Sequence, residues 1–163
     1  MQISDINITR AGHGINYLTS YSGSGCAEIE NVNFSNITMQ NTGIPLIIEG
    51  DVGYIKNCTI QNVTATSLGG ITFNATNECE ISGITVNNFE LNVIPDSRDI
   101  TAFKNHLLNL RGTTLLKVVG IKTSTLNNLT IVVDENVIST WKKSIEQENC
   151  QDFNLINCSL PQI

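Results

Sequence analysis

Charged and aromatic side chains are scarce in this sequence. Only 15% of its 163 residues are charged and 6% are aromatic, with a single Trp, three Pro and two His. Helical domains place many Ala, Glu, Lys and Arg residues on their exposed faces, because those residues favour the helix. A composition this poor in charge argues against a helical protein.

Basic residues are also few, and the formal net charge is −6. The only local basic cluster is Lys142 and Lys143, whereas proteins that bind nucleic acid carry a basic stripe or patch. An acidic chain has no electrostatic attraction to anionic lipid, and the sequence shows no apolar run long enough to span a bilayer. We therefore expect no nucleic-acid partner and no membrane partner.

The five cysteines form no Cys-x-x-Cys pair, and their odd number leaves at least one thiol unpaired within the chain. We expect buried thiols that pack as small hydrophobic side chains. His13 and His106 are the only histidines that could join them at a metal, and the spacing fits no metal-binding motif. The sequence therefore predicts neither a metal site nor a cofactor. The cysteines are Cys26, Cys58, Cys79, Cys150 and Cys158.

The sequence is rich in Ile, Val, Leu and Asn, which are arranged in a repeat of 26 residues. Internal repeats of this length are typical of solenoid proteins. Apolar residues keep one register over four successive units, in the columns Ile3, Ile29, Ile55, Ile81; Ile6, Val32, Cys58, Ile84; Ile8, Phe34, Ile60, Val86; and Ala11, Ile37, Val63, Phe89. A further apolar column comprises Tyr21, Ile47 and Phe73.

Two kinds of solenoid could have such a repeat. A leucine-rich repeat needs a denser frame of Leu and often a helix in each unit, but these units show no helical spacing. Each unit instead holds short apolar strands separated by Gly, Thr, Ser and Asn, which suits one coil of a parallel β-helix whose neighbours bury its apolar face. We therefore predict an all-β fold, a right-handed parallel β-helix.

A polar column accompanies the apolar ones. Arg10, Asn36, Asn62 and Asn88 lie seven residues after the four leading isoleucines. Asn tolerates the left-handed backbone region, and stacked Asn amides can hydrogen-bond from one coil to the next. The column therefore predicts a bend that is repeated in every coil.

The repeat is interrupted once along the chain. Regular coils span residues 1–91, residues 92–117 break the register and are interpreted as an insertion, and coils resume over 118–163. This predicts a single domain of about six coils with the insertion after the fourth, and a short helix near Trp141 that covers the end of the solenoid. The later coils are marked by the triplets Leu126, Leu129, Ile131 and Cys150, Phe153, Leu155.

One stretch of the repeat resembles a known family. Gly12-His13-Gly14-Ile15, then Ile29-Glu30-Asn31-Val32-Asn33-Phe34 and Asn41-Thr42-Gly43, are similar to the C-terminal half of the polygalacturonases, glycoside hydrolase family 28. The resemblance covers residues 10–90 or so. It implies a right-handed β-helix that hydrolyses galacturonan-type pectic chains with inversion, and it places the family's active-site histidine at His13.

Other parts of the family's site have no counterpart in this chain. The resemblance places the arginine and lysine of the family's Arg-Ile-Lys motif at Ile47 and Glu49, so both cations that would bind a uronate are missing. The family's catalytic aspartates lie upstream of the histidine motif, where this chain has only Asp5. Because inverting hydrolysis needs two carboxyl groups across the scissile bond, the resemblance implies a truncated or degenerate relative.

Five residues are candidates for contact with a glycan. His13 lies between glycines, where the backbone can approach a ligand closely, and the alternative is an ordinary turn histidine. Tyr17 follows this turn and could stack on a sugar ring, as could Tyr54. Glu49 and Asp51 lie two residues apart, on one face of a strand. They could form a carboxylate pair or bind Ca²⁺ weakly, and the alternative is a solvated turn.

Three functional classes remain open. The chain could be part of a carbohydrate-active enzyme, a non-catalytic glycan-binding module, or a phage tail-spike segment that forms a homotrimer. All three act on a polysaccharide or oligosaccharide, at an extracellular location or on a virion surface. Because the repeat already begins at Met1 without a signal peptide, we expect a fragment or a module of a longer protein.

Overall fold

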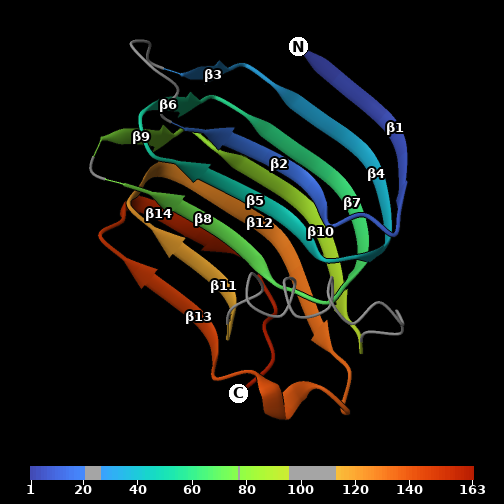
Figure 1. Cartoon of the computed structure of the whole chain (residues 1–163). Helices are drawn as coiled ribbons and strands as arrows, with labels where there is room; N and C mark the ends of the chain where they lie inside the picture. The colour runs from blue at the N-terminus through green and yellow to red at the C-terminus, as the bar shows by residue number, and fades with distance from the viewer. Residues whose placement is uncertain (21–26, 77, 96–112) are drawn as a thin grey trace.

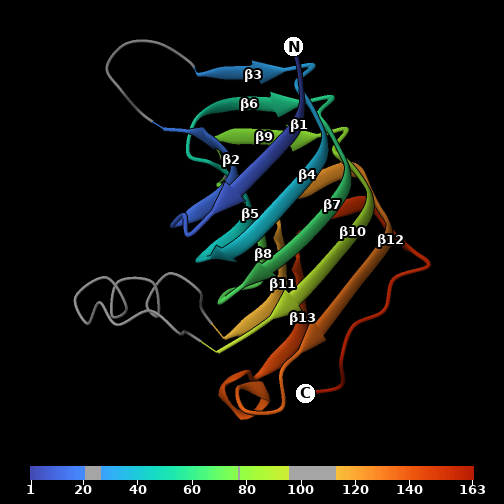
Figure 2. The ribbon, with the colours of Figure 1, turned by 90° about the vertical axis from the view of Figure 1, so that its right-hand side faces the viewer.

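The chain folds as a parallel β-helix, in which three rows of strands form the three sides of stacked coils (Figure 1). The computed structural model describes residues 1–20, 27–76, 78–95 and 113–163. Every strand pairing among the described residues is parallel, and the strands of each row lie one above the other along the solenoid (Figure 2). The prediction of an all-β parallel β-helix is therefore confirmed.

The three rows differ in the length of their strands. The long row consists of β1 (Gln2–Thr9), β4 (Asn33–Thr42), β7 (Thr59–Ser67), β10 (Thr85–Val93) and β12 (Ile121–Val133). The second row consists of β2 (His13–Thr19), β5 (Ile44–Gly50), β8 (Ile71–Ala75), β11 (Thr114–Val119) and β13 (Lys143–Glu148). The short row consists of β3 (Glu28–Glu30), β6 (Gly53–Lys56), β9 (Cys79–Ser82) and the first residues of β12.

The solenoid has about five coils rather than the predicted six. Among the described residues, the chain after the fifth coil adds the strand β14 (Gln151–Ile156) and the bridge residue Ser159, both of which pair with β12. β10 continues to Val93 and β11 begins at Thr114, so residues 92, 93 and 114–117 belong to strands of the coils. Most of the predicted insertion, residues 96–112, lies outside the described residues, as do His106 and Tyr21.

The four 26-residue columns are correct for their last three members, which lie on or directly before β4, β7 and β10 in the long row and on β3, β6 and β9 in the short row. Ile29, Ile55 and Ile81 are aligned in the short row, and the column continues to Ile121. Ile3 does not belong to it, because the first coil is longer than the repeat and Ile3 pairs with Phe34. Ile6 and Ile8 accordingly pair with Ile37 and Met39 in place of the neighbours that the sequence pattern assigned to them.

The predicted register of the fifth coil is wrong by the same five residues as that of Ile3. Leu126, Leu129 and Ile131 pair with Val86, Phe89 and Leu91 in the long row, so they are not the start of a coil. The apolar spacing of zero, three and five residues occurs both at the start of a coil and five residues later. Apolar periodicity therefore cannot distinguish the two registers.

In the second row, the predicted pairing of Ile47 with Phe73 is wrong by one residue. Phe73 pairs with Ile48, which also pairs with Tyr17, and these three side chains are buried. Ile47 pairs with Thr72. A shift of one residue along a strand exchanges the core face for the outer face.

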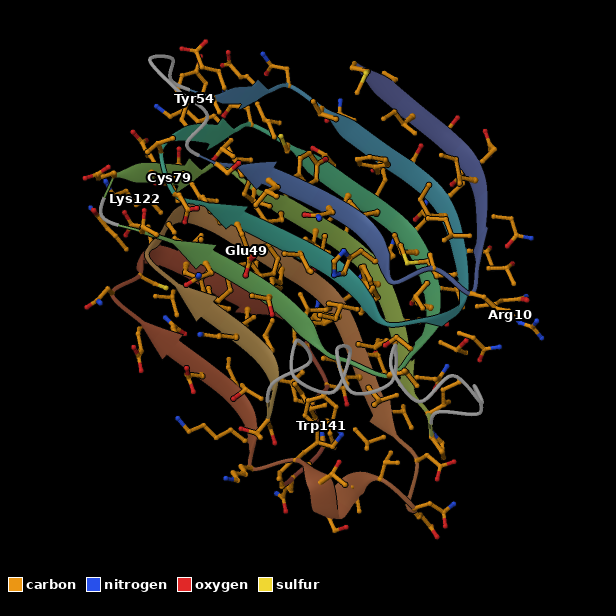
Figure 3. All side chains as sticks on the ribbon, viewed as in Figure 1. Arg10, Glu49, Tyr54, Cys79, Lys122 and Trp141 are labelled. Carbon is orange, nitrogen blue, oxygen red and sulfur yellow. The ribbon has the colours of Figure 1, made fainter. Side chains whose placement is uncertain are left out.

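The core is a single cluster of aliphatic and aromatic side chains from all three rows. The four cysteines that the structure describes are free thiols. Cys58 and Cys79 are buried in the core, as expected of small hydrophobic residues, whereas Cys150 and Cys158 are half-buried. The short helix predicted near Trp141 is the 3₁₀ turn η1 (Ile138–Thr140). Trp141 follows it and packs into the core with 4% of its surface exposed (Figure 3).

The predicted polar bend is present in the long row. Its residues have positive φ values between 52° and 58°, and they are Asp5, Asn36, Asn62, Asn88, Asn128 and Asn157. Each of Asn62, Asn88 and Asn128 donates its side-chain amide to the Asn one coil earlier, over 3.0–3.2 Å. Arg10 is not part of this column. It has a positive φ of 57° at another bend, and its side chain points away from the molecule (Figure 3).

Candidate functional site

His13 is half-buried at the start of β2, where its backbone pairs with Ile44. The glycine that follows it has a structural role. A Cβ atom at Gly14 would collide with the side chain of Met39 and the carbonyl oxygen of Pro45, both in the next coil. Gly14 therefore lets the backbone of β2 approach the neighbouring coil closely. This packing accounts for the glycine, and no ligand is needed to explain it.

Tyr17 is a core residue, so the prediction that it stacks on a sugar is wrong. Only 3% of its surface is exposed. Its hydroxyl donates to the carbonyl oxygen of Val32 over 3.1 Å, and its ring meets that of Phe34 edge to face, with centroids 5.6 Å apart. Burial raises the pKa of the Tyr17 hydroxyl far above its ordinary value.

Glu49 and Asp51 lie at the far end of β5 from His13. Glu49 is half-exposed between Leu18 and Asn74 of the adjacent strands. His13 pairs with Ile44, five positions earlier on β5, which corresponds to about 16 Å along the strand. The structure therefore does not bring His13 and Glu49 together.

Asp51 follows β5 in a bend that its backbone helps to hold. Its N–H donates to the carbonyl oxygen of Thr19 over 2.9 Å, and its own carbonyl oxygen accepts the hydroxyl of Thr76 over 2.7 Å. Its side chain is exposed. Glu49 thus lies on the strand and Asp51 in the turn after it. This arrangement agrees with a solvated turn, one of the alternatives for these two carboxylates.

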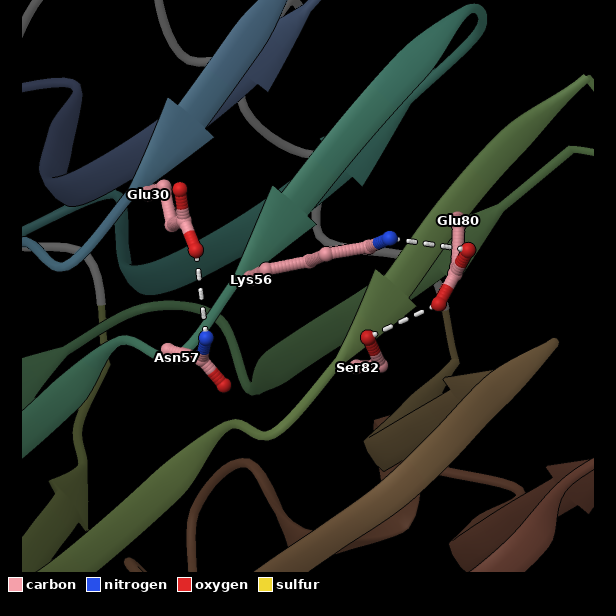
Figure 4. Close-up of polar contacts among 5 residues, drawn as sticks. All are labelled: Glu30, Lys56, Asn57, Glu80 and Ser82. Atoms are coloured by element: carbon pink, nitrogen blue, oxygen red, sulfur yellow. Dashed lines mark hydrogen bonds and ion pairs between the residues drawn. The ribbon is translucent and has the colours of Figure 1, made fainter.

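The short row carries a network of charged side chains that the candidate list did not include. Lys56 Nζ lies 3.0 Å from a carboxylate oxygen of Glu80 (Figure 4). It also lies 4.9 Å from the centroid of the Tyr54 ring. The Ser82 hydroxyl donates to Glu80, and the Asn57 amide donates to Glu30 (Figure 4). Parallel pairing of β6 with its neighbours aligns these side chains. The 26-residue repeat predicts the alignment of Glu30 with Lys56 as a cross-strand charge match, and the parallel pairing of the two residues confirms it.

The electrostatics of this network are those of satisfied surface charges. The hydrogen bond from Lys56 lowers the pKa of Glu80, and the hydrogen bond from Ser82 lowers it further. A hydrogen bond to Glu28 raises the pKa of Tyr54. Because Glu80, Glu28 and Lys56 are each engaged by a neighbour within the chain, we assign the network a stabilising role.

The outer side of the long row, after its polar bend, is a regular polar surface. We call it the long polar face and define it by the outward residues of five adjacent strands: Asn7, Thr9, Thr38, Gln40, Thr64, Thr66, Glu90, Asn92, Thr130 and Val132. Eight of the ten are exposed, and Thr66 and Thr130 are half-buried. The residues that alternate with them point into the core, which fixes their orientation.

The long polar face forms two columns of side chains that run along the solenoid. One column is continuous through Asn7, Thr38, Thr64, Glu90 and Thr130, which pair in register from strand to strand. Strands of a sheet lie about 4.8 Å apart, and alternate residues of one strand about 7 Å apart. The face therefore presents hydroxyl and amide groups at regular intervals, with Glu90 as its one charged residue and Val132 as its one apolar residue.

Two further features are defined for the described part of the chain. There, no group of three or more His, Cys, Asp or Glu side chains is arranged to hold a metal ion. Its helical structure includes no segment that combines the length and the apolar character needed to cross a bilayer.

The comparisons with known proteins place the chain in no family. No protein-family model, no curated protein and no solved structure matches it.

Proposed function

We propose that this protein is a polysaccharide-binding β-helix that uses the long polar face to hold its ligand. The observation that carries the proposal is the column Asn7, Thr38, Thr64, Glu90 and Thr130, exposed or half-exposed on adjacent strands. Thr and Asn side chains offer both donors and acceptors of hydrogen bonds, which are the groups that sugar hydroxyls require. A repeating polymer can thus make the same contact at successive coils.

The energetics suit many weak contacts. A single exposed hydrogen bond contributes only about 0.5–1.5 kcal/mol, but contacts made by linked units of one ligand reinforce each other. The strands hold the β-branched side chains of Thr38, Thr64 and Thr66 in few rotamers, so little conformational entropy is lost on binding. A rigid, regular face of this kind favours a long ligand over a single sugar.

The long polar face supports binding without hydrolysis. Glycosidic hydrolysis uses a pair of carboxyl groups that flank the scissile bond. Among the ten residues of the face, Glu90 is the only one with a carboxyl group. The proposed activity is therefore recognition of an intact polysaccharide.

The wider setting of the protein is part of the same proposal. A degenerate relative of the glycoside hydrolase family 28 enzymes, or a tail-spike module, would retain the coil and the polysaccharide ligand while losing the catalytic groups. Either would act outside the cell or on a virion surface, and a tail-spike module would form a homotrimer. The missing counterparts of the family's Arg and Lys at Ile47 and Glu49 support a ligand other than a polyuronate.

The test is a binding assay on immobilised galactomannan, xyloglucan, arabinoxylan, mixed-linkage β-glucan, methyl-esterified polygalacturonate and polygalacturonate. The double variant Thr38→Val/Thr64→Val removes two hydroxyls of the face and keeps their shape. At about 0.5–1.5 kcal/mol for each lost hydrogen bond, we expect it to weaken binding about fivefold to a hundredfold.

The matched control is Thr72→Val, which removes one hydroxyl from β8 in the second row. It should bind as the wild type does. The proposal fails if the wild type binds none of the polysaccharides, or if the double variant and the control bind equally well. A reducing-end assay on the same polymers should show no hydrolysis.

A further inference from the structure

Glu90 lies on the fourth of the five strands that form the long polar face. It lies on β10, exposed, between Thr64 of β7 and Thr130 of β12, with which it pairs in register. Asn92, two residues further along the strand, lies on the same face. A ligand that covers the face therefore has to pass over this carboxylate.

The surroundings of Glu90 leave its charge uncompensated on the face. The other nine residues of the face are uncharged. Within the described ranges, the ion pairs are those of Lys56 with Glu80 and of Lys143 with Glu146, and neither includes Glu90. A net charge of −6 adds to the negative potential around it.

We propose, on the basis of the polysaccharide-binding function above, that Glu90 determines the ligand class of the face: it admits uncharged polysaccharides and excludes polyuronates. A carboxylate accepts hydrogen bonds from the hydroxyls of a neutral sugar. The same group repels the carboxylate of a uronate. Specificity of this kind is a difference between two affinities, achieved by penalising the wrong ligand.

The expected size of the effect follows from Coulomb's law. Repulsion between two like unit charges about 4 Å apart in water lowers the affinity by roughly a factor of five. A polyuronate brings several carboxylates near the face. Repulsion by Glu90 and by the net charge should therefore weaken its binding about tenfold or more, relative to an uncharged polymer, at low salt. Salt screens exposed charges beyond a Debye length of about 8 Å at physiological ionic strength, so high salt should reduce the discrimination.

A matched pair of ligands isolates the charge. Polygalacturonate and its methyl-esterified form share one backbone and differ in whether the carboxyl groups are ionised. The wild type should bind the methyl-esterified form at least about tenfold more tightly. Glu90→Gln should reduce this preference several-fold, and Glu90→Lys should abolish or reverse it, with affinity for polygalacturonate that falls as salt is added.

Glu148→Lys is the control, because it makes the same change in net charge at an exposed position of β13, in another row. It should change the preference much less than Glu90→Lys does. The inference is overturned if Glu90→Lys binds polygalacturonate no better than Glu148→Lys. It is also overturned if the wild type binds both forms equally. Failure to bind any of the uncharged polymers would instead contradict the proposed function.

Discussion

The side-chain amide of Asn36 donates to a carboxylate oxygen of Asp5 over 3.1 Å. This contact ends a ladder in which the amides of Asn62, Asn88 and Asn128 all donate in the same direction, toward the first coil. The aligned amides place their donor end at Asp5, where a negative charge is favourable. Aspartate at this position thus terminates a chain of asparagines that has a defined polarity.

We predict that Asp5 makes stability depend on acid pH. Hydrogen bonds from Ser4 and Asn36 lower the pKa of Asp5 below its ordinary value of 3.8. A carboxyl group with a lowered pKa in the folded state stabilises the protein above its unfolded-state pKa, and this contribution is lost as the pH falls through the folded-state value. The variant Asp5→Asn keeps an acceptor at the end of the ladder but does not titrate.

The measurement is the thermal midpoint of both proteins from neutral pH to pH values below the pKa of Asp5. The difference between wild type and Asp5→Asn should shift in favour of the variant as the pH falls. Parallel curves at all pH values would show that the ionised carboxylate of Asp5 does not stabilise the folded protein through its hydrogen bond to Asn36.

We predict that Asn62 is stabilising for two separable reasons. It has a φ of 55° and forms hydrogen bonds to both Asn36 and Asn88. Asn62→Gly removes the hydrogen bonds but tolerates the backbone, whereas Asn62→Ala also adds left-handed strain of about 1 kcal/mol. Urea denaturation should give a loss of about 1–3 kcal/mol for Ala and a smaller loss for Gly. Equal losses would contradict the strain argument.

We predict that Ile60→Asp unfolds the domain. Ile60 is fully buried in the middle of a column that contains Phe34 and Val86, and an unpaired carboxylate at that position would cost several kcal/mol. Gln61→Asp, at the exposed neighbouring position, is the control and should remain folded. Circular dichroism and a thermal melt distinguish them, and a soluble Ile60→Asp variant that melts cooperatively would contradict the inward position of Ile60.

We predict a small effect from breaking the ion pair between Lys56 and Glu80. The Glu80 side chain is 43% exposed, and exposed ion pairs contribute about 0–1 kcal/mol because water and salt screen them. Lys56→Met should therefore change the free energy of unfolding by less than about 1 kcal/mol, and by less still at high salt. A loss of several kcal/mol in urea denaturation would show that the network on β3, β6 and β9 is a major source of stability.

The sequence predicted the coil and its bends because these repeat. Ile29, Ile55 and Ile81 align as expected, since this register directs all three toward the core, where Ile55 and Ile81 are buried and Ile29 is half-buried. Ile3 and Leu126 were misplaced for a common reason, because the apolar spacing of a coil recurs five residues later. The residues in the left-handed region remove this ambiguity: Asp5 and Asn128, with Asn36, mark the bend in each of these coils.

The candidate site was predictable only in part. Tyr17 was assigned to the surface because proximity to a turn does not reveal whether a strand residue faces the core. Its alternation with Ile15 and Thr19, both buried, places it inside. The long polar face was not predicted, because its residues alternate with the apolar columns from which the repeat was identified. Thr38 and Thr64, 26 residues apart, carry the same repeat on the outer side.

The most direct test of the account is an NMR titration of the isotope-labelled protein with neutral oligosaccharides cut from whichever uncharged polysaccharide of the panel it binds. Backbone amide shifts should concentrate on β4, β7 and β10, around Thr38, Thr64 and Glu90. Shifts that centre on His13 and Glu49, or on Tyr54, with the long polar face unchanged, would contradict the account.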